Sequence, residues 1–120
     1  MIMLIIRNEQ MNAFREQSLT DFRARAEQEI RSVWLEICSV IGNDAVSASI
    51  DMAIERSRHY HLTTEFCTMR YLHLMYRLGF DFDMDDTLPW AGRILNDDLM
   101  SDGDRVRLLE MNGEMVSPKI

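Results

Sequence analysis

Lysine, proline and cysteine are scarce in this chain. Its 120 residues include one lysine, Lys119, two prolines and two cysteines. Residues 8–41 contain neither proline nor glycine, so the sequence shows no helix breaker there. Two cysteines allow at most one disulfide. We expect Cys38 and Cys67 to be reduced thiols on apolar helix faces, with a disulfide between them as the alternative.

Sequence motifs of enzymes are also lacking. The chain contains no nucleophile elbow, phosphate-binding loop or dinucleotide fingerprint. Its three histidines, His59, His61 and His73, are not spaced as zinc ligands. Cys67 and His73 are too poorly placed along one helix to face each other as a nucleophile and its base. We therefore expect a protein that is not an enzyme, with no catalytic residues, no metal and no cofactor.

Hydrophobic runs long enough to span a membrane are absent. Residues 1–6 are apolar, but the run is short, no basic region precedes it and no small-residue cleavage site follows. The sequence thus predicts neither an export signal nor a membrane contact, and we expect a cytoplasmic protein.

Negative charge is in excess and is concentrated towards the end of the chain. The formal net charge is −7. Residues 80–120 contain ten acidic and four basic residues, whereas residues 1–79 are close to neutral. Because such a surplus repels phosphate backbones, nucleic acid is an unfavourable partner.

Apolar residues recur at helical spacing along most of the chain. Residues 8–41 carry one continuous stripe, and residues 8–17 are a separate helix if Ser18 acts as an N-cap. The stripe consists of Leu19, Phe22, Ala26, Ile30, Val33, Ile37 and Val40. Further helices are predicted at 44–60, 64–78, 88–96 and 102–111, with an extended N-terminus at 1–7 and a loose tail at 112–120.

The helix at 64–78 is apolar on most of its circumference, with Phe66 in one of its two apolar rows, which is typical of a central helix. Thr63 or Thr64 is expected to cap its start, and Gly79 its end. We therefore predict a compact all-α, single-domain bundle of four to six helices. A long N-terminal helix and a central third helix complete the predicted architecture.

The segment 79–95 combines acidic, aromatic and proline residues in one connection. Its candidate partner-binding residues, which we call the acidic corner, are Asp81, Asp83, Asp85, Asp86 and Trp90. The alternating aspartates resemble half of an EF-hand loop. Asp86 replaces its turn glycine and Gly92 its bidentate glutamate, so a calcium site is not expected.

Two further interpretations of this segment remain open. The aspartates are expected to cap the helix that begins near Leu88, while Phe80 and Phe82 turn inward. Trp90 either seals the end of the core or is exposed as an anchor for a partner. The chain also contains ten methionines, which serve either as core gap-fillers or as an adaptable binding surface.

The chain resembles a family of small helical proteins encoded in bacterial type VI secretion gene clusters, beside VgrG spike, PAAR and toxin-effector genes. The matching stretches include Ile30-Arg31-Ser32-Val33-Trp34, Ile54-Glu55-Arg56-Ser57, Leu78-Gly79 and, most distinctively, Asp81-Phe82-Asp83 with Leu88-Pro89-Trp90-Ala91. Two departures affect turns: His61 stands where the family has glycine, and Asp85-Asp86 replaces its Asp-Pro.

This resemblance implies a cytoplasmic adaptor or co-chaperone that binds an effector, another adaptor or a VgrG-type spike protein. It supplies no catalytic residues. The alternative is an immunity protein that binds and occludes a toxin acting in the cytoplasm. A homodimer that uses the long first apolar stripe is a third possibility. In the first two cases the acidic corner would meet a basic partner surface.

Overall fold

The computed structural model describes residues 16–116, with side chains from Ser18 onward. The expectations for residues 1–7 and for the end of the tail lie outside these residues. The described part contains six α-helices, one 3₁₀ turn and no strand. In order they are α2 (Glu16–Val33), α3 (Leu35–Ile41), α4 (Asn43–His59), α5 (Glu65–Leu78), η1 (Phe82–Met84), α6 (Pro89–Leu95) and α7 (Asp102–Gly113). The predicted all-α bundle is confirmed.

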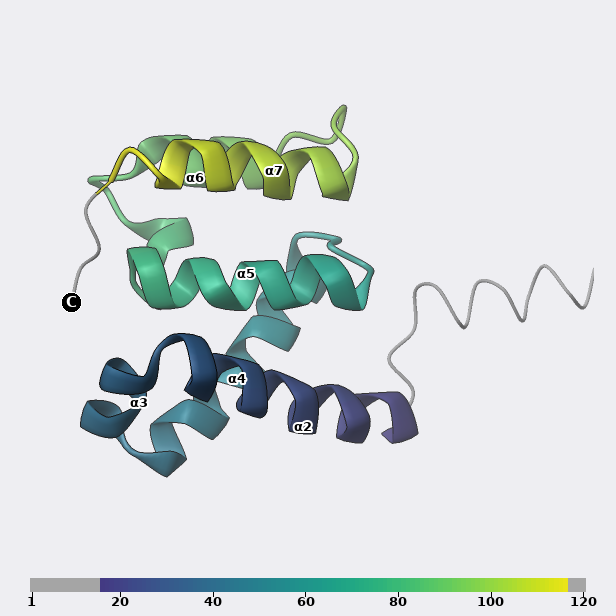
Figure 1. Cartoon of the computed structure of the whole chain (residues 1–120). Helices are drawn as coiled ribbons and strands as arrows, with labels where there is room; N and C mark the ends of the chain where they lie inside the picture. The colour runs from purple at the N-terminus through teal and green to yellow at the C-terminus, as the bar shows by residue number, and fades with distance from the viewer. Residues whose placement is uncertain (1–15, 117–120) are drawn as a thin grey trace, which may run out of the picture.

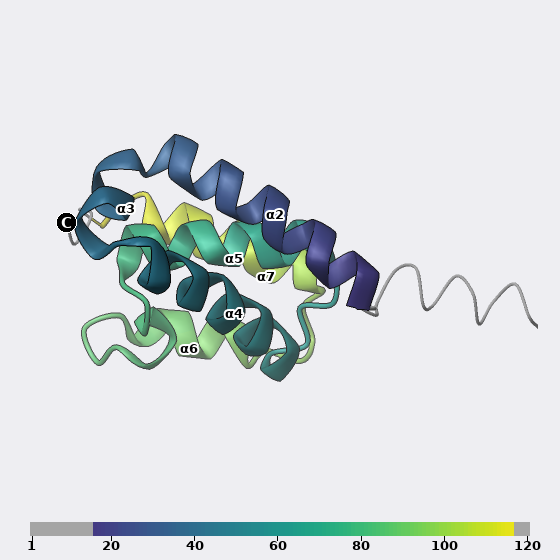
Figure 2. The same cartoon turned by 90° about the horizontal axis from the view of Figure 1, so that it is seen from below.

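The helices pack in two layers. Helices α2, α5 and α7 lie side by side in Figure 1, and Figure 2, which is turned by 90°, shows α4 and α6 along the lower side of this layer. Helix α5 contacts α2, α4 and α7, and most of its side chains are buried. It is therefore the central helix that its apolar circumference predicts, although Phe66 is 62% exposed and does not belong to the core.

The long first helix is interrupted. Helix α2 ends at Val33, and Trp34 has φ −116° and ψ 47° before α3 begins. The break turns part of the predicted stripe outward, because Val33 is 58% and Val40 81% exposed. Phe22, Ala26 and Ile30 are fully buried. The continuous stripe predicted over residues 8–41 is therefore wrong beyond Ile30, apart from the buried Ile37.

Most predicted helix ends are confirmed. Thr64 Oγ1 accepts a hydrogen bond from the Cys67 N–H at 3.1 Å, and Ser101 Oγ accepts one from the Asp104 N–H at 3.1 Å. Gly42 and Gly79 have φ values of 90° and 114°, which glycine adopts at little cost. By contrast, Ser18 lies inside α2 and does not cap it.

The last helix extends beyond its predicted end and is tied to its neighbours. Helix α7 runs to Gly113, so the start of the predicted tail is helical. Arg77 of α5 donates to the carbonyl oxygens of Gly113 and Val116 at 3.0 and 3.2 Å. Because a helix leaves its last carbonyls unpaired, this arginine fixes the end of α7 against α5.

No single helix among residues 16–116 is both long and apolar enough to cross a membrane. Only α3 and α4 taken together meet that test of length and composition, and the pair is bent by 111°.

Candidate functional site

The acidic corner is attached to α4 by one arginine and one tyrosine. Arg56 Nη1 donates to Asp83 Oδ1 at 2.7 Å, and Tyr60 OH donates to Asp83 Oδ2 at 2.6 Å. The second terminal nitrogen of Arg56 donates to Asp81 at 2.9 Å. The Asp83 side chain is only 2% exposed, so both of its oxygens are used inside the fold. Asp81, in contrast, keeps a 70% exposed side chain.

Two buried tyrosines, Tyr60 and Tyr71, lie next to the ion pair between Arg56 and Asp83. Burial, followed by the hydrogen bond to Asp83, raises the pKa of Tyr60 to about 12. Burial, together with the charge of Asp83, also raises the pKa of Tyr71. Both phenols are therefore neutral, and Tyr60 is held as a hydrogen-bond donor to the carboxylate.

The aromatic residues of the segment support the corner from inside. Phe82 is fully buried, with its ring centroid 5.0 Å from that of Tyr71. Phe80 is partly buried, 5.1 Å from Tyr76. Both rings turn inward as predicted. Trp90 is half-buried and packs against the core, which agrees with the interpretation that it seals the core.

The remaining two aspartates of the corner have different environments. Asp85 Oδ1 accepts hydrogen bonds from the backbone N–H and the hydroxyl of Thr87, at 2.8 and 2.7 Å, which forms a local Asx turn. Asp86 is exposed. The N-cap residue of α6 is Leu88, with Pro89 in the first turn, so the predicted aspartate cap is wrong.

A groove of about 570 Å³ runs between α4 and η1, beside this ion pair. Ala48, Met52, Glu55 and His59 form its α4 wall, at the spacing of one helix face. Met84 lines the groove from η1 and is 67% exposed. The groove thus joins exposed and half-buried methionine to acidic side chains.

The groove between α4 and η1 carries net negative charge. Asp51 lines the groove and pairs with Arg23 at 2.8 Å on its outer side. Glu55 is exposed and has no ion pair or hydrogen bond with the other described residues. Arg56, the groove's one arginine, is already shared between Asp81 and Asp83. A cationic partner would therefore meet unneutralised carboxylate charge at Glu55.

Sequence reasoning identified the acidic loop but missed the α4 side of this site. Arg56 and Tyr60 lie 27 and 23 residues before Asp83. One signal was available: Met52, Arg56 and Tyr60 recur every four residues and therefore share one helix face. Nothing in that spacing indicates which later segment packs against the face.

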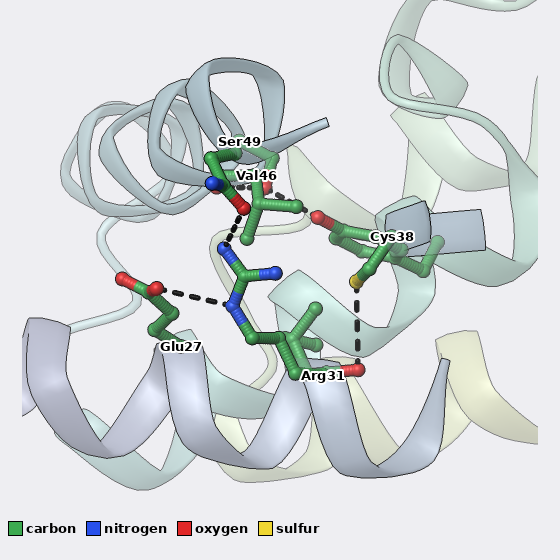
Figure 3. Close-up of polar contacts among 8 residues, drawn as sticks. Glu27, Arg31, Cys38, Val46 and Ser49 are labelled. Atoms are coloured by element: carbon green, nitrogen blue, oxygen red, sulfur yellow. Dashed lines mark hydrogen bonds and ion pairs between the residues drawn. The ribbon is translucent and has the colours of Figure 1, made fainter. Parts of the chain in front are cut away.

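The remaining candidates for chemistry are dispersed. Cys38 and Cys67 are free and buried, and burial raises the pKa of both thiols. Figure 3 shows Cys38 at the junction of α2 and α3, where its thiol donates to the Ile30 carbonyl at 3.7 Å. In the same view Arg31 pairs with Glu27 of the same helix at 3.0 Å, and its Nη2 also donates to Asn43, the first residue of α4, at 2.8 Å. These contacts indicate a structural junction.

Metal-binding groups do not converge in the part of the chain that is described. Residues 16–116 contain no group of three or more histidine, cysteine, aspartate or glutamate side chains placed to hold an ion. The EF-hand-like aspartates are instead occupied by Arg56, Tyr60 and Thr87.

Comparison with known proteins gives no match: no protein-family model, no curated protein and no solved structure matches this chain.

Proposed function

We propose that this chain is a non-enzymatic accessory protein, an adaptor or co-chaperone, for an effector or spike protein of a type VI secretion system. Two arguments support the proposal. One is the resemblance carried by residues 81–95. The other is the observation on which the choice of surface depends, namely the acidic, methionine-bearing groove between α4 and η1.

The apolar part of this groove suits a protein partner. Met84 and Met52 present flexible thioether side chains that adapt to irregular apolar surfaces. An exposed methionine beside a concave surface gains by burial against a partner, at about 25 cal/mol for each Å² removed from water. A partner side chain packed between them would supply the apolar centre of a small interface.

The charged part of the groove selects a basic partner segment. Glu55 lines the groove and is exposed, Asp81 is exposed and paired with the groove's Arg56, and Asp86 is exposed further along the same loop. Charge complementarity of this kind acts chiefly on the rate of association and on specificity. Asp83 contributes indirectly, because it holds the loop against α4.

The test is binding to purified spike and effector proteins encoded beside the gene for this chain, measured by calorimetry at two salt concentrations. Met84→Ser should weaken binding about tenfold, which corresponds to about 1.4 kcal/mol. Glu55→Lys should weaken binding and reduce its dependence on salt, because it removes a negative charge that attracts a basic partner. Leu99→Ser and Glu36→Lys are matched controls, since both residues are exposed and lie outside the groove.

Each outcome decides one part of the proposal. If the groove variants bind as well as the controls, the groove is not the binding surface. If no spike or effector protein binds the wild-type chain, the secretion-accessory function is wrong. A toxin whose activity is abolished by stoichiometric complex formation would assign the immunity role instead.

A further inference from the structure

A chain of three polar side chains connects α2 to α5 on the layer that faces away from the groove. Trp34 Nε1 donates to His73 Nδ1 at 3.0 Å, and His73 Nε2 lies 2.6 Å from Glu29 Oε2. The indole ring also packs 6.2 Å from Tyr76, centroid to centroid. Trp34, His73 and Glu29, which we call the Trp–His–Glu latch, join the break between α2 and α3 to the central helix α5.

Hydrogen-bond chemistry fixes the protonation of His73 in this arrangement. An indole N–H can only donate, so Nδ1 must accept and cannot carry a proton. The single proton of the ring therefore lies on Nε2 and is donated to the Glu29 carboxylate. The latch exists only with a neutral His73 in this one tautomer.

A second proton breaks one contact and strengthens the other. It would occupy Nδ1, the atom that now accepts from Trp34, so two N–H donors would face each other. The bond to Glu29 would become an ion pair. Histidine is the side chain whose charge changes most readily between pH 5 and 8. Acid thus exchanges the Trp34 contact for a charged contact with Glu29.

The charges around His73 come from three helices. Glu29 of α2 favours the cation and is 47% exposed. Arg70 and Arg77 of α5 disfavour the protonated ring, whereas Glu110 of α7 and Glu114, the residue after α7, line a cavity beside His73 and favour it. Arg70 is paired with Glu110 at 2.6 Å, so these two charges largely cancel. Glu29 is left as the direct charged partner of the imidazole.

We propose that the Trp–His–Glu latch is a proton-operated device that controls the position of Trp34. At neutral pH the indole is held on His73, at one side of a cavity of about 270 Å³ between α5 and α7. When His73 becomes charged, the indole leaves the imidazole and the cavity loses that wall. The break between α2 and α3 then loses the hydrogen bond that ties Trp34 to α5.

The experiment uses the full chain with Trp90→Phe, which leaves Trp34 as the only tryptophan. Emission is recorded from pH 8 to pH 5, with far-UV circular dichroism to show that the helices persist. We expect the emission maximum of Trp34 to move to longer wavelength as the pH falls, along a curve that fits the binding of one proton. His73→Gln should abolish the shift, although His59 and His61 remain.

An emission shift that survives His73→Gln would overturn the proposal, as would constant emission in the Trp90→Phe chain. A second measurement does not depend on that substitution. Nitrogen-15 shifts of the wild-type His73 ring at pH 8 should identify the Nε2-protonated tautomer. Finding the proton on Nδ1 would exclude the latch even if a variant failed to fold.

Discussion

Arg105 Nη1 lies 2.7 Å from the carbonyl oxygen of Leu95, the last residue of α6. The same nitrogen donates to the carbonyl of Tyr60, at the end of α4, also at 2.7 Å. Arg105 is only 6% exposed and forms no ion pair with a described carboxylate. The negative ends of two helix dipoles stand in place of a counter-ion.

Arg105→Met should therefore lower the free energy of unfolding by about 2–4 kcal/mol, because two buried carbonyls lose a charged donor. Urea unfolding followed by circular dichroism measures the change. Arg107→Met is the matched control, since Arg107 is exposed on the same helix, and it should change stability by less than about 0.5 kcal/mol. Equal effects of the two substitutions would contradict the role given to Arg105.

Asp83→Asn should destabilise the fold by about 2–3 kcal/mol, because Arg56 and Tyr60 lose a buried carboxylate. Asp86→Asn, in the same loop but exposed, is the control and should be nearly neutral. A double-mutant cycle with Arg56→Met tests the pairing directly. Coupling between positions 56 and 83 below about 0.5 kcal/mol would show that the two residues act independently.

The tyrosines predict a loss of stability in alkali. Burial raises the pKa of Tyr60, Tyr71 and Tyr76 in the folded chain, with Tyr60 at about 12. A raised folded pKa favours the fold below the unfolded value near 10, and that contribution is lost as the pH rises through the folded pKa. Absorbance of tyrosinate should therefore appear above pH 10 together with unfolding. A separate tyrosine transition near pH 10 in folded protein would contradict this.

His61 is the one residue other than glycine, among those described, with a positive φ, at 60°. The left-handed region costs such a residue about 1 kcal/mol, so His61→Gly should be more stable than His61→Ala by about that amount. Thermal unfolding of the two variants gives the comparison.

Gly92, inside α6, is a glycine whose replacement is limited by space. Gly92→Ala would bring a Cβ within 3.2 Å of the Asp83 carbonyl oxygen.

Local signals explain what the sequence could predict. Thr64, Ser101 and Gly79 act within one turn of a helix end, so their residue types alone indicate the boundaries. The inward face of α4 also follows from spacing, because residues that recur at helical intervals along it are all buried: Val46, Ile50, Ala53, Ile54 and Ser57.

The rest depends on contacts between distant residues. No glycine or proline marks the break at Trp34, whose side chain instead bonds a histidine 39 residues later. The predicted acidic corner likewise omitted Arg56 and Tyr60, which both hydrogen-bond to the buried Asp83, whereas the exposed Asp81 is bonded by Arg56 alone. Nothing in the sequence indicates that Arg105 is buried, because its partners are backbone carbonyls, which any residue carries.

The dependence of α4 and α6 on Arg105 has a consequence for biosynthesis. Chains emerge from the ribosome with their N-terminal part first, and early segments begin to fold before later ones appear. Here the ends of α4 and α6 keep unpaired carbonyls until α7 has been made. The domain therefore completes its fold only after α7 has left the ribosome, and a chain interrupted before α7 would expose the apolar surface that chaperones and proteases recognise.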